Sequence, residues 1–112
     1  IVDAAMNNLI RPSLYQAHHE IVPLLLDERP HKVVDVVGPV CETGDFLAKD
    51  RKLPDIQPGE YLAVTGAGAY GQALSSNYNL RPRIAEYLVD GGEVRTIYKG
   101  QTIEDIFQEF EI

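Results

Sequence analysis

Cysteine and tryptophan are scarce in this chain, which has one cysteine, Cys41, and no tryptophan. A single cysteine excludes an internal disulfide and a zinc site built from several cysteines. We therefore expect Cys41 to be a free thiol in a reducing compartment, and we expect the protein to be cytoplasmic.

Positive charge and long hydrophobic runs are also in short supply. The 112 residues carry 10 lysines and arginines against 17 aspartates and glutamates, which gives a net charge of −7 at pH 7. Nucleic acids and anionic membrane surfaces are bound through basic patches, so we expect neither as a partner. The apolar run at residues 22–26 is far shorter than the roughly 20 residues of a membrane-spanning helix.

The length of the chain, 112 residues, allows one modest hydrophobic core and therefore a single domain, residues 1–112. Chemistry that needs two domains would require another chain. The first residues, Ile1 and Val2, are apolar and follow no initiator methionine, so we expect the N-terminus to be a cut end.

Short apolar segments separated by turn-forming residues predict a mainly β domain. We expect a short helix or an irregular loop within residues 3–15, because Asn7, Asn8 and Pro12 disfavour a long helix. Residues 39–60 contain three prolines and are expected to be mostly loop, with a brief extended piece near Phe46. Strands are expected at residues 20–26, 32–37 and 60–65, the last of them buried.

The C-terminal third carries the clearest local signals. Asp90, Gly91 and Gly92 separate two extended runs and predict a β-hairpin over residues 85–98. Thr102 and Asp105 have the spacing of a capping box, and apolar residues recur after Thr102 at helical spacing. We therefore expect a short amphipathic helix at the C-terminus and a β-barrel or sandwich as the architecture.

The segment CETGD at residues 41–45 places a thiol beside two carboxylates in a glycine-containing loop. Negative charges nearby oppose ionisation of a thiol, so Cys41 is better suited to donate a proton than to act as a nucleophile. The local sequence leaves an alternative open, in which Cys41 is a small buried residue and Glu42 is simply solvated.

Two further groups of residues suggest ligand binding. Arg11 and Tyr15 lie four residues apart and together suit a carboxylate, because arginine offers a planar fork of donors. The alternative is an ordinary surface arginine and a half-buried tyrosine. Tyr70 lies in the segment GAGAYG, which lacks the residues of a nucleotide-binding loop but can bring a hydroxyl close to a phosphate or a substrate.

Other polar residues are expected to have structural roles only. His18 and His19 point to opposite faces of an extended chain, so we expect no metal site there. Asp45 is likewise expected to have no role in a site. The residues expected to hold a loop rather than to do chemistry are Asn77, Arg81 and Arg83.

Three motifs, DAAMNNLIRPSLY, GPVCETGDFLAKDR and GAGAYGQALSSNYNLRP, occur in this order and together resemble the C-terminal part of the diaminopimelate decarboxylase family. The resemblance spans nearly the whole chain. It implies a fold-type III enzyme, related to alanine racemase and ornithine decarboxylase, that uses pyridoxal 5′-phosphate to decarboxylate meso-diaminopimelate to L-lysine. It also implies a homodimer in which an N-terminal (β/α)8 barrel holds the cofactor and a C-terminal β domain completes the site.

The resemblance further implies roles for individual residues. Arg11 and Tyr15 match positions that bind the distal carboxylate of the substrate. Cys41 matches a cysteine that reaches in from the partner subunit and protonates the carbanion left by decarboxylation. Glu42 matches an acid that recognises the distal amine, and Tyr70 matches a tyrosine that contacts the cofactor phosphate and the substrate.

The match is incomplete, because the barrel, its phosphate loop and the cofactor lysine are not in this sequence. We therefore expect the chain alone to be inactive. Two smaller departures, DAAMN for DAGMN and CETGD for CESGD, leave the chemistry intact.

Two other functions stay open: a related decarboxylase of another basic amino acid, and a non-catalytic β domain for association or regulation. Arg11 favours a substrate with a distal carboxylate, because its charge opposes a distal guanidinium or amine.

Overall fold

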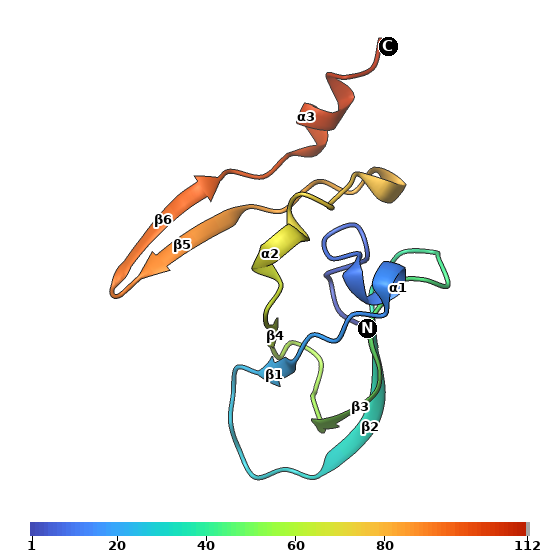
Figure 1. Ribbon diagram of the computed structural model, residues 1–112, viewed down its shortest axis with the longest axis vertical. Coiled ribbons are helices and arrows are strands. Elements are labelled where there is room, and N and C mark those ends of the chain that lie inside the picture. Colours follow the sequence, from blue (N-terminus) through green and yellow to red (C-terminus); the bar gives the residue numbers. More distant parts are fainter. Residues whose placement is uncertain (112) are drawn as a thin grey trace.

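The computed structural model describes residues 1–111 and is built mainly from β-strands, with short helices. Within these residues, six strands form three antiparallel sheets of two strands each, in which β1 pairs with β4, β2 with β3 and β5 with β6 (Figure 1). The elements in chain order are α1 (Arg11–Tyr15), β1 (Ile21–Pro23), β2 (His31–Val37), β3 (Phe46–Pro54), β4 (Leu62–Val64), α2 (Gly68–Gly71), the 3-10 helix η1 (Tyr78–Leu80), β5 (Glu86–Asp90), β6 (Glu93–Tyr98) and α3 (Ile103–Phe107).

The strands of residues 1–111 close no barrel, although the sequence predicted a β-barrel or sandwich. A barrel closes only when every strand pairs along both of its edges. Each strand here has one partner, and β1 and β4 are only three residues long. The mainly β class and the short helices near both ends are confirmed.

The longest strand, β3, lies where the sequence predicted mostly loop, and that expectation was wrong. Prolines do not interrupt the strand, because the one that it contains, Pro54, is its last residue. Its centre is polar, with Asp50 exposed, whereas Leu47, Ala48 and Leu53 nearer the ends are buried. Because the centre is polar, a prediction based on apolar runs did not identify this strand.

The hydrophobic core joins β1, β2 and β3 to the segment before α1. Its buried members are Leu9, Ile21, Val36, Leu47, Ala48 and Leu53. The strand expected at residues 60–65 shortens to β4, whose residues are half-buried rather than buried. β4 pairs only with β1, through three residue pairs such as Ile21 with Val64, so it packs at the margin of the core.

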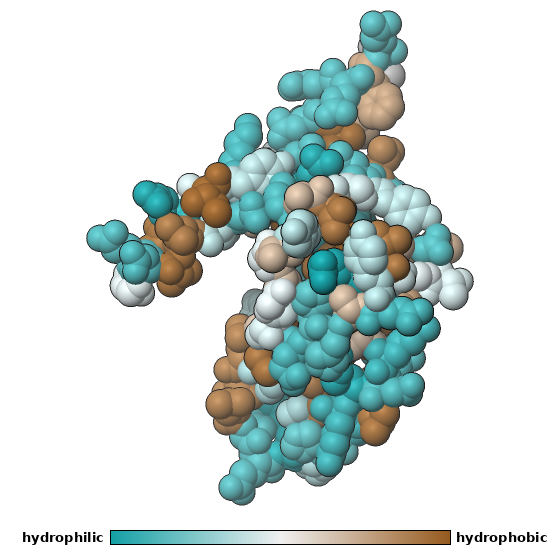
Figure 2. Space-filling view, in the orientation of Figure 1, coloured by the Kyte–Doolittle hydropathy of each residue, from teal (hydrophilic) through white to brown (hydrophobic). Residues whose placement is uncertain are grey.

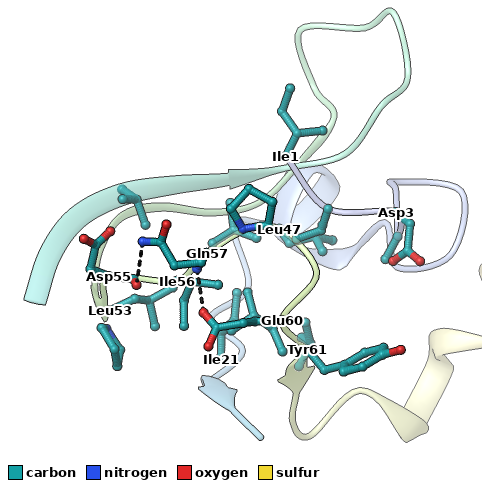
Figure 3. Close-up of a pocket in the computed structure, with 18 of the residues that line it drawn as sticks. Ile1, Asp3, Ile21, Leu47, Leu53, Asp55, Ile56, Gln57, Glu60 and Tyr61 are labelled. Atoms are coloured by element: carbon teal, nitrogen blue, oxygen red, sulfur yellow. Dashed lines mark hydrogen bonds between the residues drawn. The ribbon is translucent and has the colours of Figure 1, made fainter. Parts of the chain in front are cut away.

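An open groove of about 700 Å³ borders this core (Figure 3). Its walls include Ile21 and Leu53 from the strands and Glu60 and Tyr61 from the segment before β4. Within residues 1–111, none of the five predicted site residues lines this groove. The predicted site therefore lies elsewhere.

The predicted β-hairpin is confirmed. Asp90 pairs with Glu93, so that Gly91 and Gly92 form a two-residue loop, and Gly91 has a φ of +58° that glycine adopts without strain. The hairpin projects from the rest of the chain (Figure 1), and hydrophobic side chains gather along it (Figure 2). The exposed apolar residues of the two strands are Tyr87, Leu88, Val89, Val94 and Ile97.

The predicted capping box at the start of α3 is also confirmed. The Asp105 backbone N–H donates to the Thr102 hydroxyl at 3.1 Å, and the Thr102 backbone N–H donates to the Asp105 carboxylate at 2.8 Å. Ile106 is buried while Ile103 and Phe107 stay largely exposed, so the apolar face of α3 is only partly covered. No helix within residues 1–111 has the length and apolarity needed to cross a membrane.

Candidate functional site

Helix α1 carries the first two predicted site residues, Arg11 and Tyr15. Pro12 was expected to interrupt any helix here, but it lies in the first turn, where a helix does not need its N–H. The helix ends at Gln16, which has a left-handed φ of 56° and donates its backbone N–H to the Arg11 carbonyl. Arg11 and Tyr15 are four residues apart and thus share one face of the helix.

Arg11 lies against two tyrosine rings. Its guanidinium carbon is 5.8 Å from the centre of the Tyr15 ring and 5.9 Å from the centre of the Tyr70 ring. Both distances are typical of cation–π contacts. Both tyrosines are more than half exposed, and within residues 1–111 the Arg11 side chain makes no hydrogen bond. The arrangement leaves the donors of Arg11 available to an anionic group.

Tyr70 is set toward Arg11 by an unusual backbone conformation. Within α2 it adopts φ 65° and ψ −5°, the left-handed region, which is uncommon for a residue other than glycine. Residues in such conformations persist only when their surroundings hold them, and they are frequent at functional sites. Sequence analysis placed Tyr70 in a glycine-rich turn but could not bring it next to Arg11.

The loop with the CETGD motif, residues 41–45, packs against the segment that contains α1. Asp45 is buried and accepts hydrogen bonds from the backbone N–H groups of Met6 at 2.8 Å and Val40 at 2.7 Å. Gly44 lies so close to α1 that a Cβ atom at this position would be 2.8 Å from the Ser13 hydroxyl. Asp45 thus holds the loop against the segment before α1, and Cys41 is an exposed free thiol.

Glu42 is paired with a tyrosine that sequence analysis did not single out. The Tyr78 hydroxyl donates to Glu42 Oε2 at 2.8 Å, and the Gly44 N–H donates to Glu42 Oε1 at 3.3 Å. The bond from Tyr78, followed by those from backbone N–H groups, lowers the pKa of Glu42 below its usual range. The carboxylate in turn raises the pKa of Tyr78. The only sequence signal for Tyr78 was its position in the third motif.

The turn that carries Tyr78 is anchored on Asn7, which is 2% exposed. The Asn7 side chain donates to the Ser76 carbonyl at 3.2 Å and accepts from Arg81 Nε at 3.0 Å. Asn77 donates to the Arg81 carbonyl at 3.0 Å, and Arg83 donates to the Ser75 carbonyl at 3.3 Å. The loop-holding roles predicted for these residues are confirmed.

Both neighbouring histidines contact residues that are distant in the sequence, among them Arg51. His19 is buried with its Nδ1 3.2 Å from the Thr65 carbonyl, and its own carbonyl accepts from Arg51 at 2.8 Å. His18 is exposed and lies 3.3 Å from Glu20. Within residues 1–111, no group of three or more histidine, cysteine, aspartate or glutamate residues is placed to hold a metal ion.

The predicted site residues thus form two groups. Arg11, Tyr15 and Tyr70 form the first group, and Cys41 and Glu42 belong to the loop that packs against α1 through Gly44. A shallow pocket of about 530 Å³ borders the second group. Its lining combines apolar side chains with one carboxylate: Met6, Asn7, Ile10, Glu42, Leu74, Ser76 and Tyr78. Such a surface suits a ligand that has both an aliphatic arm and a cationic group.

Comparison with known proteins assigns the chain to a family. Residues 1–68 match the model of the family described as pyridoxal-dependent decarboxylase, C-terminal sheet domain. The chain belongs to this family. The matched residues include Arg11, Tyr15, Cys41 and Glu42, whereas Tyr70 and Tyr78 follow them in the sequence.

Curated relatives of this family member are diaminopimelate decarboxylases. The protein from Aquifex aeolicus is 57% identical over 108 residues, which make up 96% of this chain and 26% of the relative. The protein from Vibrio cholerae is 50% identical over 107 residues, with 96% and 25% covered. The chain therefore spans about a quarter of the length of the curated relatives that it matches.

Solved structures agree with this assignment. The crystal structure of AQ1208 from Aquifex aeolicus superimposes with a TM-score of 0.92 at 56% identity, over 96% of this chain and 27% of that one. Diaminopimelate decarboxylase from Helicobacter pylori, solved in complex with L-lysine, superimposes with a TM-score of 0.89 at 42% identity, over 96% and 27%. The arrangement of short sheets and helices is thus shared with these two proteins.

Proposed function

We propose that this chain is the C-terminal part of an enzyme that decarboxylates meso-diaminopimelate to L-lysine and CO₂ with the help of pyridoxal 5′-phosphate. The proposal is supported by the family, by the diaminopimelate decarboxylases among its relatives and by the L-lysine bound in the Helicobacter pylori enzyme. The observation that carries it is the placement of Arg11, flanked by two tyrosine rings, on the helix against which the Cys41–Glu42 loop packs.

The two charged side chains fit the two ends of an amino acid group. Arg11 offers a fork of unused N–H donors that can bind a carboxylate through two parallel hydrogen bonds. Tyr15 flanks this fork and restricts its orientation. Glu42 presents an ionised carboxylate that attracts an ammonium group. Diaminopimelate has both groups at the end of the molecule that does not react.

The thiol of Cys41 is proposed to supply the proton that replaces the lost carboxylate. When CO₂ leaves, the electron pair of the broken bond stays with the substrate, and a proton must be delivered to that carbon. Cys41 is exposed, so its Sγ–H can reach a substrate held outside this chain. In the proposed homodimer this thiol acts in the site of the partner subunit.

The side chains present fit the margin of a cofactor site rather than its centre. Tyr70 presents an exposed hydroxyl that can donate to a phosphate. Lys32 is paired with Asp55 at 2.7 Å and Lys49 lies 4.3 Å from the centre of the Phe46 ring, so both are engaged away from Tyr70. The lysine that holds pyridoxal 5′-phosphate is proposed to come from the rest of the enzyme, as the family resemblance implies. When bound, the cofactor supplies an electron sink for the decarboxylation.

A homodimer in the cytoplasm completes the proposal. The exposed apolar side chains of the hairpin, such as Tyr87, Val89 and Val94, would be covered by other parts of a complete dimer. The single unpaired cysteine is consistent with a reducing compartment.

The test uses the full-length enzyme that carries this segment, loaded with pyridoxal 5′-phosphate. Release of CO₂ from meso-diaminopimelate should be lowered about 100-fold in kcat/KM by Arg11→Leu, because a bidentate bond to a carboxylate is lost. Lys52→Leu, which removes an exposed positive charge on β3, is the matched control and should retain activity. Equal losses of Arg11→Leu on diaminopimelate and on a substrate without the distal carboxylate would favour a decarboxylase of another basic amino acid. No turnover by the wild-type enzyme would favour a non-catalytic domain.

A further inference from the structure

Tyr78 contacts the one carboxylate of the site that points at a pocket. Its hydroxyl donates to Glu42 Oε2 at 2.8 Å, while the Gly44 N–H donates to the other oxygen, Oε1, at 3.3 Å. Two donors on two different oxygens fix the plane of a carboxylate. Without Tyr78, the exposed Glu42 side chain would be held only by the longer bond from its own loop.

The turn that presents Tyr78 is itself held rigidly. Asn79 and Leu80 have left-handed φ values of 57° and 56°, and this conformation is unfavourable for leucine. The turn keeps this conformation because Arg81 is bonded to the buried Asn7 and to the Asp3 carbonyl. Strain that the surroundings maintain is typical of segments that position a functional group.

The surface beside the Glu42–Tyr78 pair fits an aliphatic chain that ends in a cation. Met6, Ile10 and Leu74 form apolar walls, and the Glu42 carboxylate is the charged group of the pocket. The bond from Tyr78 also lowers the pKa of Glu42 below its usual range, because the hydrogen bond favours the ionised carboxylate. A cation that approaches Glu42 would therefore meet an oriented negative charge.

We propose that Tyr78 is a positioning residue, whose hydroxyl orients the Glu42 carboxylate for the distal ammonium group of the substrate. This inference rests on the proposed decarboxylation of diaminopimelate. Tyr78 acts through Glu42 and takes no part in breaking the bond to CO₂. Its removal should therefore weaken substrate binding and leave the chemical step intact.

The first experiment is Tyr78→Phe in the full-length enzyme loaded with pyridoxal 5′-phosphate. We expect KM for meso-diaminopimelate to rise about tenfold, because a hydrogen bond to a charged group is lost, with kcat within about twofold of the wild type. The affinity for the cofactor, measured by absorbance titration, should not change. Tyr61→Phe, which alters an exposed tyrosine away from this pocket, is the control and should leave KM unchanged.

The second experiment separates positioning from a structural effect. In a Glu42→Ala background, Tyr78→Phe should cause no further rise of KM, because the group that it positions is gone. Additive effects of the two substitutions, an unchanged KM, or a fall in kcat together with cofactor affinity would overturn the inference while wild-type turnover stands. A wild-type enzyme that releases no CO₂ from diaminopimelate would overturn the proposed function and this inference with it.

Discussion

The segment around the candidate site is held by hydrogen bonds between residues far apart in the sequence, whereas the C-terminal hairpin is held by pairing between neighbouring strands. At the site, buried polar side chains join distant parts of the chain: Asp45 bonds to the backbone of Met6, and Asn7 bonds to Arg81. In the hairpin, β5 and β6 pair across a two-residue glycine loop, and their apolar side chains are exposed. Long-range polar bonds thus fix the residues proposed to act on substrate, whereas local backbone preferences fix the hairpin.

This difference explains how the structure can present an exposed site that is still ordered. Arg11, Cys41 and Glu42 lie near the surface, where apolar packing cannot hold them. The bonds from buried Asn7 and Asp45 fix the backbone that carries them. The hairpin needs no such network, because neighbouring residues supply all of its strand pairing.

The largest effect is expected from Asp45→Ala, which removes long-range hydrogen bonds that hold the candidate site. The substitution leaves the N–H groups of Met6 and Val40 without their acceptor in a buried place, so the free energy of unfolding should fall by about 3 kcal/mol. Urea unfolding followed by circular dichroism measures the loss. Asp35→Ala is the matched control: it removes an exposed carboxylate that accepts one N–H, from Asp50, and should cost less than about 1 kcal/mol. Equal losses in the two variants would contradict the comparison.

The difference between local and long-range contacts also explains which features could be predicted from the sequence. The hairpin and the capping box follow from Asp90-Gly91-Gly92 and from Thr102 with Asp105, which are close in the chain and could be predicted. The pairing of Glu42 with Tyr78 spans 36 residues and leaves no local pattern. Motif resemblance marked the site residues, but it could not show that Tyr70 lies against Arg11.

Strand β3 shows a second limit of local analysis. Its ends are buried but its centre is polar, so no uninterrupted apolar run or clean alternation marks it. What makes it a strand is pairing with β2 along most of its length, a partner that becomes available only in the folded chain. Within residues 1–111, the lack of a closed barrel has the same origin, because the partner of a strand cannot be identified from that strand's own residues.

A smaller effect is expected at the hairpin loop, where a substitution tests whether local backbone preferences specify the hairpin. Gly91→Ala should destabilise the hairpin by about 1 kcal/mol, because φ at this position is +58° and a Cβ atom is unfavourable there. Gly92→Ala is the matched control, since Gly92 lacks a positive φ and has open space around it, and it should have little effect. Hydrogen exchange of the β5 and β6 amides should speed up about fivefold in Gly91→Ala alone. A loss that spreads to β2 and β3 would show that the hairpin is not independently specified.

The last expected effect depends on pH and concerns Glu60→Gln, which compares a half-buried ion pair with the buried carboxylate of Asp45. Arg29 binds both oxygens of Glu60, at 2.6 and 2.7 Å, and this contact, followed by the Gln57 N–H, lowers the pKa of Glu60 to about 2 from 4.5. A lowered pKa in the folded state adds stability above pH 4.5 that is lost as the pH falls toward 2. Urea midpoints measured across this range should therefore fall less steeply in Glu60→Gln than in the wild type.

The exposed Glu93→Gln is the control for this acid dependence and should keep the wild-type slope. If Glu60→Gln also keeps that slope, the acid sensitivity must arise from another carboxylate held by Arg29, such as Asp27, whose pKa is lowered as well. A reduced slope together with lower stability at pH 7 would instead show that this half-buried ion pair makes stability depend on pH. Buried Asp45 would then remain the carboxylate on which the site depends.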